Sequence, residues 1–358
     1  MRLFYIFLTF FITQLSIAQD LQDGPYVSYR NDSVFIQSVE QGKVVKDSSR
    51  SNKSKPIQLT VHFPTHDNWN FRVNLKPAIQ NEPSEFPQPE KLLVLSDIEG
   101  EFEGFRKILI GNGVIDESYN WTYGKGHVVI CGDLFDRGLS VPETIWLMYK
   151  LELPAKNAGG YFHVILGNHD IMNLSGDLRY VQPKYLESAG KLGVNYMQLY
   201  SPDSELGRWL RSKNSIERIG DALYLHAGIA PQINRIKLSV NKINKRSRPY
   251  YDKAPNMNGV GNSSADPFFT DSTSLFWYRG YFQQPVATEA DVDETLRFYK
   301  VKKIIVGHTI LKGNIALYYN GKVIGIDVDR HAGDNQAALF ENGIWYKVDE
   351  NGSRTELK

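Results

Sequence analysis

The stretch HVVICGD (127–133) is a short apolar run that stops at a glycine and an aspartate. Four more segments have the same form: KLLVLSD (91–97), YFHVILGNH (161–169), ALYLHAG (222–228) and KKIIVGH (302–308). Runs of this length, rich in Val, Ile and Leu, are typical of strands buried on both faces. Because open α/β sheets bind ligands beyond the carboxyl ends of their strands, we expect a two-metal site at one sheet edge. The polar residues at these strand ends are Asp97, Asp133, Asn168, His169, His226 and His308.

The spacing of these runs predicts the core topology. Intervals of 36 and 35 residues separate Asp97, Asp133 and Asn168, which suits successive strand–helix–strand units. The segments 103–115 and 142–153 supply the intervening helices, with Gly111 and Pro154 at their ends. The pattern therefore predicts a central α/β core with strand-rich ends, in which the later strands form a second sheet.

Four parts of the chain differ in pattern. The first 18 residues resemble a signal peptide, with Arg2 before an apolar stretch and small residues at Ser16 and Ala18, so cleavage near Ala18 and export to a periplasm or the exterior are expected. No stable membrane anchor is expected. Residues 19–90 alternate in polarity and predict a strand-rich extension. The main domain then spans 91–349, with inserts at about 173–222 and 231–271, before a tail at 350–358.

Composition excludes some partners. The 358 residues carry a formal net charge of +1, which disfavours a broad surface for nucleic acid, so no nucleic-acid partner is expected. The single cysteine, Cys131, lies inside a predicted strand and is interpreted as a buried core thiol.

Three motifs carry a family resemblance. GDLFDRG (132–138), followed by LGNHDIMNL (166–174) and WYRGY (277–281), resembles the calcineurin-like metallophosphoesterases, in their phosphoprotein phosphatase branch and near the bacterial Shewanella-like phosphatases. The resemblance covers about residues 91–329. It implies an α/β fold of two packed mixed β-sheets flanked by helices, with the strand-rich extension and inserted cap segments added to it.

The resemblance also implies roles for individual residues. It implies hydrolysis of phosphomonoesters by a metal-bridging hydroxide, with His169 as general acid supported by Asp136. Arg137 and Arg279, together with Asn168, are expected to bind the substrate phosphate, and Arg279 rests on WYRGY alone. Two divalent ions are expected, Mn, Fe or Zn, with Mn favoured. Their implied ligands are Asp97, Glu99, Asp133, Asn168, His226 and His308, with Asp133 bridging both ions.

One position departs from the family pattern. The family motif is Asp-any-His, whereas this chain has Asp97-Ile98-Glu99. The extra carboxylate suits a hard ion such as Mn or Mg better than zinc, and it lowers the net positive charge that attracts phosphate. Two interpretations stay open: Glu99 binds the first metal, or it turns away and that metal is weak or absent.

The substrate and the reaction both stay open at this stage, and three alternatives remain for the function. The first is the phosphomonoesterase described above. The substrate is a phosphorylated small molecule or a phosphoprotein, with phosphoserine and phosphotyrosine both admissible. The same site also suits a phosphodiesterase or a nucleotide pyrophosphohydrolase. A degenerate module that binds phosphorylated ligands without turnover is the third. The remaining histidines keep a structural interpretation, and His331 stands out among them because it follows another predicted strand end.

Overall fold

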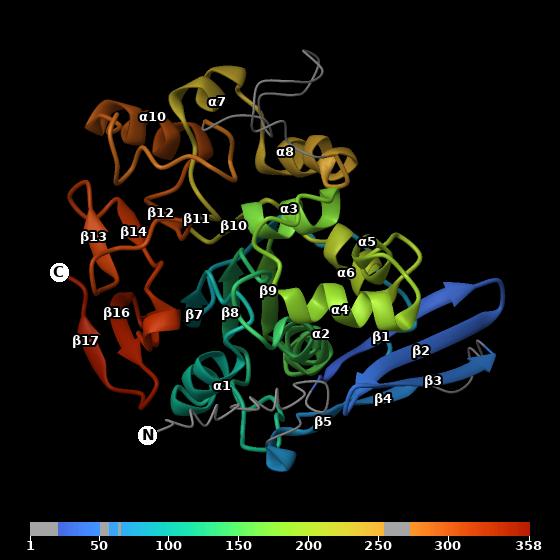
Figure 1. The fold of residues 1–358 in the computed structure, drawn as a ribbon. Coiled ribbons are helices and arrows are strands. Elements are labelled where there is room, and N and C mark those ends of the chain that lie inside the picture. The colour runs from blue at the N-terminus through green and yellow to red at the C-terminus, as the bar shows by residue number, and fades with distance from the viewer. Residues whose placement is uncertain (1–20, 51–56, 64–65, 254–272) are drawn as a thin grey trace, which may run out of the picture.

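Two six-stranded sheets form the centre of the protein (Figure 1). The computed structural model describes residues 21–50, 57–63, 66–253 and 273–358. The predicted signal peptide and residues 254–271 of the second predicted insert lie outside these ranges. The first sheet has the order β17-β16-β15-β7-β8-β9 and the second β13-β14-β12-β11-β10-β6. Their strands are β6 (Glu85–Phe86), β7 (Lys91–Leu95), β8 (His127–Cys131), β9 (Tyr161–Ile165), β10 (Ile216–Ile219), β11 (Ala222–Leu225), β12 (Lys303–Val306), β13 (Ala316–Tyr318), β14 (Val323–Gly325), β15 (Gln336–Glu341), β16 (Ile344–Asp349) and β17 (Arg354–Glu356).

The five apolar runs form strands β7, β8, β9, β11 and β12. Strands β7, β8 and β9 are parallel, as are β11 and β12, so their carboxyl ends point the same way within each sheet. Alternate residues of one strand face opposite layers: Val94 and Cys131 pack between the two sheets, whereas Leu93 and Leu95 join the larger core. Burial on both faces explains why these runs are almost wholly apolar.

Helices cover the outer faces of the sheets. The helix after β8 continues past Pro154 to Asn157, so the predicted end at Pro154 was wrong. A proline this close to a helix end removes one hydrogen bond, and the buried Ala155 keeps the last turn packed. The helices are α1 (Phe102–Gly111), α2 (Val141–Asn157), α3 (Asn168–Ser175), α4 (Pro183–Leu192), α5 (Tyr196–Leu199), α6 (Glu205–Arg211), α7 (Pro231–Ile236), α8 (Val240–Ser247) and α10 (Glu289–Tyr299), with short 3-10 turns η2 (Asp67–Trp69), η3 (Arg248–Tyr250) and η4 (Arg330–Ala332).

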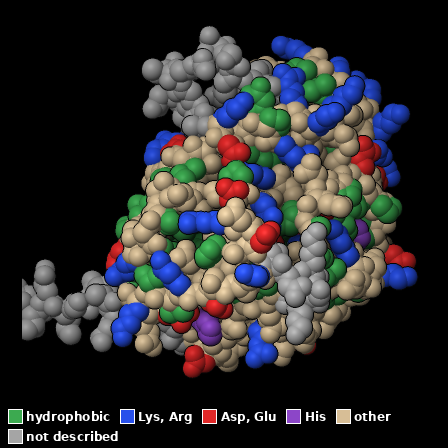
Figure 2. Space-filling view, turned by 90° about the vertical axis from the view of Figure 1, so that its right-hand side faces the viewer, with side chains coloured by type: hydrophobic (Ala, Val, Ile, Leu, Met, Phe, Trp, Pro, Cys, Tyr) green, Lys and Arg blue, Asp and Glu red, His purple; other side chains and the backbone are tan. Residues whose placement is uncertain are grey.

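The N-terminal extension forms two small sheets. One contains β1 (Asp23–Arg30), β2 (Ser33–Glu40) and β3 (Lys43–Arg50), and the other pairs β4 (Gln58–Val61) with β5 (Phe71–Asn74). The indole N–H of Trp146 in α2 donates to the carbonyl of Pro25, which ties β1 to the core. Acidic and basic side chains are interspersed over the face that carries β1–β3, as the low net charge implies (Figure 2).

Pairing across the sheets differs from the simplest sequence expectation in two places. Strands β15 and β16 do not join the second sheet, because β15 pairs antiparallel with β7 and extends the first. Strand β17, within the predicted tail 350–358, pairs with β16. Within the described ranges, no helix combines the length and apolar character needed to cross a bilayer.

Candidate metal centre

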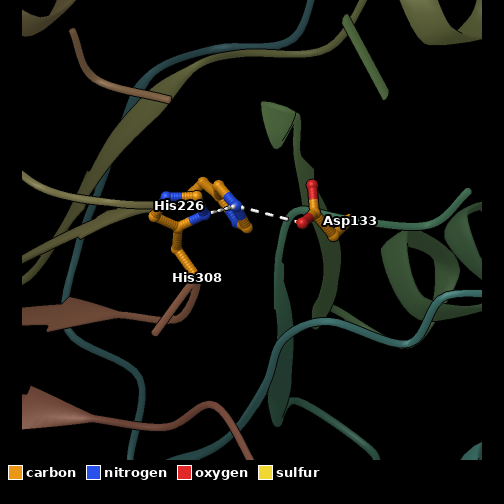
Figure 3. Close-up of side chains that lie close together, drawn as sticks. All are labelled: Asp133, His226 and His308. Carbon is orange, nitrogen blue, oxygen red and sulfur yellow. Dashed lines mark hydrogen bonds and ion pairs between the residues drawn. The ribbon is translucent and has the colours of Figure 1, made fainter. Parts of the chain in front are cut away.

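Four side chains meet where β8, β9, β11 and β12 end. Nε2 of His226 lies 2.8 Å from Oδ1 of Asn168, 3.1 Å from Nδ1 of His308 and 3.2 Å from Oδ2 of Asp133. Figure 3 shows the two imidazoles facing the Asp133 carboxylate. Each residue comes from a different strand end, and all four are buried. The predicted ligands of the second metal are therefore brought together at one point.

The hydrogen-bond pattern of these four residues suits a bound cation. Nδ1 of His226 lies 2.8 Å from the carbonyl oxygen of Cys131, which can only accept, so this nitrogen carries a proton. The second nitrogen of His226 then faces the carboxylate oxygen of Asp133 and the amide oxygen of Asn168, which both accept, as well as Nδ1 of His308. A proton or a metal ion at this point satisfies them, and imidazole, amide and carboxylate donors suit a first-row divalent ion.

Charge within the group supports the same conclusion. Burial lowers the pKa of His226, but the carboxylates of Asp133 and Asp97 outweigh burial and raise that pKa to about 9. Burial and the neighbouring His226 hold the pKa of His308 well below its usual value. One imidazole thus takes a positive charge beside the carboxylates while the other stays neutral, as expected where a cation belongs.

The predicted first-metal ligands lie beside this group. Oδ2 of Asp97 accepts the backbone N–H of His308 at 3.0 Å, and the N–H of Glu99 donates to the carbonyl of Asp133 at 2.9 Å. Potential ligand atoms of Glu99, Asp133 and His169 lie within 4.8 Å of one another. The structure therefore places a buried Glu99 next to the bridging position predicted for Asp133.

The predicted acid is firmly oriented. Nδ1 of His169 donates to Oδ2 of Asp136 at 2.6 Å, and Nε2 lies 3.4 Å from Nη2 of Arg137. Burial lowers the pKa of His169, but Asp133 and the hydrogen-bonded Asp136 outweigh burial and raise it. The amide Nδ2 of Asn173 donates to the other oxygen of Asp136 at 2.8 Å. The contact with Asp136 favours a protonated imidazole, whereas the Arg137 guanidinium, which can only donate, opposes it, and the catalytic role of His169 stays a prediction.

The two arginines differ in their surroundings. Arg137 is 43% exposed in its side chain and touches Oε1 of Glu99, while Nη1 of Arg279 donates to the carbonyl of His308 at 2.6 Å and to Oγ1 of Thr309 at 3.2 Å. Both line a cavity of about 510 Å³ over the metal residues. Arg279 thus lines this cavity with part of its guanidinium already bonded to the backbone, and its contact with phosphate stays a prediction.

The backbone at the strand ends is strained into the left-handed region. This conformation costs a residue with a side chain about 1–3 kcal/mol and persists only where the surroundings impose it. Gly132 also has φ +86°, and a Cβ there would lie 2.6 Å from the backbone nitrogen of Gly167, so the turn before Asp133 admits only glycine. The left-handed site residues are Asp97 (φ 50°), Glu99 (46°), Asp133 (55°), Asp136 (76°), Arg137 (52°) and His308 (67°).

Sequence reasoning missed several residues around the site. Oδ2 of Asp170 accepts the N–H of Gly167 at 2.7 Å and that of Asp133 at 3.1 Å, so it joins two of the loops, and burial raises its pKa to about 7. The loop after β14 adds Asp327 and His331 to the cavity wall. His331, which the sequence analysis singled out among the structural histidines, contacts Glu99 through its Nε2. Its position after a strand end was the available signal.

Comparison with known proteins gives the same assignment. The model of the calcineurin-like phosphoesterase family matches residues 90–311. Shewanella-like protein phosphatase 2 of Arabidopsis thaliana is 29% identical over 72% of this chain and 76% of its own length, and Shewanella-like protein phosphatase 1 of Plasmodium berghei is 26% identical over 73% and 72%. The crystal structure of a cold-active protein-tyrosine phosphatase of a psychrophilic Shewanella species superposes with a TM-score of 0.84 at 33% identity, covering 94% of this chain and 99% of that one.

The agreement extends from the motifs to the whole fold. The two packed mixed sheets predicted from the resemblance are confirmed, and so is the assignment to the phosphoprotein phosphatase branch with its Shewanella-like members. Proteins of this family use divalent metals, and the residues gathered at the strand ends suit them. The chain belongs to the calcineurin-like phosphoesterase family and is a metallophosphoesterase-type phosphatase of the Shewanella-like group.

Proposed function

We propose that the protein is an exported phosphatase that hydrolyses phosphomonoesters at a dinuclear metal site. One observation carries this proposal: Asp133, Asn168, His226 and His308 converge on one point, with the hydrogen-bonded pair His169–Asp136 at its side. Metal ligands alone would also suit a storage or structural site. A buried, oriented histidine beside them supports proton transfer to a leaving group.

Each group of side chains has a separate role in the proposed reaction. Asp97, Glu99 and Asp133 would hold one divalent ion and Asp133, Asn168, His226 and His308 the other; such ions supply charge neutralisation and a more acidic water. Arg137 offers paired N–H donors that match phosphate oxygens. Asp136 orients His169, whose Nε2 lies on the cavity side and would protonate the leaving oxygen.

One exposed aromatic residue beside His169 supports an aryl phosphate as the substrate. The ring of Tyr180 is 46% exposed and its centroid lies 5.0 Å from that of His169. Because His169 faces the leaving oxygen in this mechanism, the group attached to that oxygen would lie beside Tyr180. The related Shewanella structure is that of a protein-tyrosine phosphatase, which agrees with phosphotyrosine as the preferred ester.

The central experiment tests hydrolysis after metal reconstitution. Chelator-treated protein is loaded with Mn, Fe or Zn, and phosphate release from p-nitrophenyl phosphate is followed. We expect turnover that returns with metal, strongest with Mn because Asp97 and Glu99 are hard oxygen donors. His226→Ala should abolish it, whereas His62→Ala, at an exposed histidine, should not. No phosphate release with any of the three metals would refute the proposal.

Two further comparisons define the reaction. Faster hydrolysis of bis-p-nitrophenyl phosphate than of the monoester would indicate a diesterase instead. For the substrate, Tyr180→Ser should lower kcat/KM for a phosphotyrosine peptide roughly two- to twelve-fold, the value of one aromatic contact, while Tyr180→Phe retains it. An equal loss for a phosphoserine peptide would contradict the aromatic contact.

Export is proposed from the first 18 residues alone. N-terminal sequencing of protein recovered from the periplasm or medium of expressing cells should begin near Gln19. Recovery of the full-length chain from the cytosol only would contradict export and leave the phosphatase proposal untouched.

A further inference from the structure

One histidine outside the predicted ligand set contacts the position where the chain departs from its family. His331 lies in η4, on the loop between β14 and β15. Its Nε2 lies 2.8 Å from Oε2 of Glu99, and its Nδ1 lies 2.9 Å from Oε1 of Glu101. The ring therefore stands between two carboxylates that come from the loop after β7, more than 200 residues earlier in the chain.

Glu99 is held from two directions. Oε2 faces His331, while Oε1 touches Nη1 of Arg137. The side chain is only 4% exposed, and potential ligand atoms of Glu99 lie within 4.8 Å of those of Asp133 and His169. The carboxylate is thus fixed at the edge of the metal site instead of turning out to solvent.

The loop that carries His331 is itself well ordered by contacts. Oδ1 of Asp329 accepts the N–H of Ala332 at 3.1 Å and caps the turn. The neighbouring Arg330 is buried, and it donates from Nε to the carbonyl of Ser96 at 3.2 Å and from Nη2 to that of Gln336 at 2.8 Å. Because these contacts fix the backbone on both sides of His331, the contact between the imidazole and Glu99 costs little further conformational entropy.

We propose that His331 is a positioning residue for the first metal ion, acting through Glu99. The family motif supplies a histidine at this place, and here a glutamate and a distant histidine replace it together. Ligating carboxylates are usually hydrogen-bonded by outer residues that orient them, and Glu99 has such a partner in His331. The inference rests on the proposed two-metal function and assigns a residue that the family motif does not contain.

Metal binding tests the proposal without relying on turnover. Chelator-treated wild type, His331→Leu and His331→Gln are titrated with Mn²⁺, and bound metal is counted after dialysis. Loss of an outer-shell partner typically weakens metal binding 10- to 100-fold. We expect His331→Leu to lose that much affinity for one ion and to keep the other. His331→Gln should retain binding, because its amide N–H can reach Glu99, and His62→Leu is the matched control.

A second substitution separates positioning from simple structural damage. Glu99→His restores the family motif, and in that background the carboxylate that His331 orients is gone. We expect His331→Leu to have no further effect on Mn²⁺ affinity in the Glu99→His protein. Paramagnetic resonance adds a direct readout: the coupled signal of two neighbouring Mn²⁺ ions should change to that of isolated ions in His331→Leu alone.

The outcomes distinguish this inference from the proposed function. One result would overturn the role of His331 and keep the proposed phosphatase. In that result, the wild type binds two ions and hydrolyses substrate, and His331→Leu binds both ions equally well. Equal weakening in the Glu99 and Glu99→His backgrounds would overturn it as well. Wild type that binds no second ion or lacks activity would refute the proposed function first.

Discussion

The contact between Asp136 and His169 offers the sharpest test of the mechanism, through Asp136→Asn. Both carboxylate oxygens of Asp136 accept N–H groups: Oδ2 from Nδ1 of His169 at 2.6 Å and Oδ1 from Nδ2 of Asn173 at 2.8 Å. Asn173 cannot turn over without losing a bond, because its Nδ2 also donates to the backbone carbonyl of His169 at 2.9 Å, which can only accept. An asparagine at 136 has one acceptor oxygen, so one of the two donors must face its NH₂ group.

The magnitude follows from the hydrogen bond that is lost. Hydrogen bonds to charged groups contribute about 1.5–3 kcal/mol, which corresponds to roughly 10- to 150-fold in rate if the bond orients His169 in the transition state. The loss should be largest for an alkyl phosphate, whose leaving alkoxide needs a proton. It should be small for p-nitrophenyl phosphate, whose leaving group is already a weak base.

The assay compares kcat/KM of wild type and Asp136→Asn on a series of phosphate esters of increasing leaving-group basicity. Asp177→Asn, an equivalent change at a surface carboxylate paired with Arg179, is the control for the substitution itself. A steeper dependence on leaving-group basicity in Asp136→Asn is expected. Equal losses on every ester, or none, would refute the assignment of His169 as an acid oriented by Asp136.

Three other predictions concern stability and metal binding. Burial raises the pKa of Glu143 to about 7 from 4.5, so the folded state binds more protons than the unfolded state between these values, and this one group should lower stability by about 3 kcal/mol as pH rises through them. Glu143→Gln should reduce the pH dependence of urea unfolding between pH 5 and 8 by this contribution, while buried Asp170 keeps its own, and an unchanged pH dependence would contradict the assignment. Lys213 is buried between Glu152 at 2.5 Å and Glu82 at 3.0 Å, and changing it to Met leaves these two carboxylates with only Lys76 and Lys156 as cationic partners. Urea unfolding should therefore show a loss of about 3 kcal/mol, the lower end for a broken buried pair, and a loss below about 1 kcal/mol would argue against a buried ion pair. Asn168→Ala removes the amide oxygen that faces His226, which is one predicted metal ligand. Calorimetric Mn²⁺ titration should then show that one of the two sites is weakened, whereas two unchanged sites would exclude Asn168 as a ligand.

Much of the site follows from the sequence because its parts are local. Each ligand predicted for the second metal sits at the end of its own apolar run, so strand prediction and the rule for parallel sheets together place Asp133, Asn168, His226 and His308 at one edge. The pair His169–Asp136 is also local to two motifs. The helix limits were less well determined, since the burial of Ala155 outweighs the local signal of Pro154.

Tertiary structure decided what depends on distant pairing. Nothing near Glu99 in the sequence predicts that His331 contacts it, because the contact exists only after β15 pairs with β7 and brings the loop before β15 over the first strand end. The same pairing places β15–β17 in the first sheet instead of the second. Sequence patterns report which face of a strand is buried, whereas the strand that pairs with it is set by the packing of the whole chain. The sequence by itself determined the residues at the strand ends, and the folded arrangement decided which outer residues hold them.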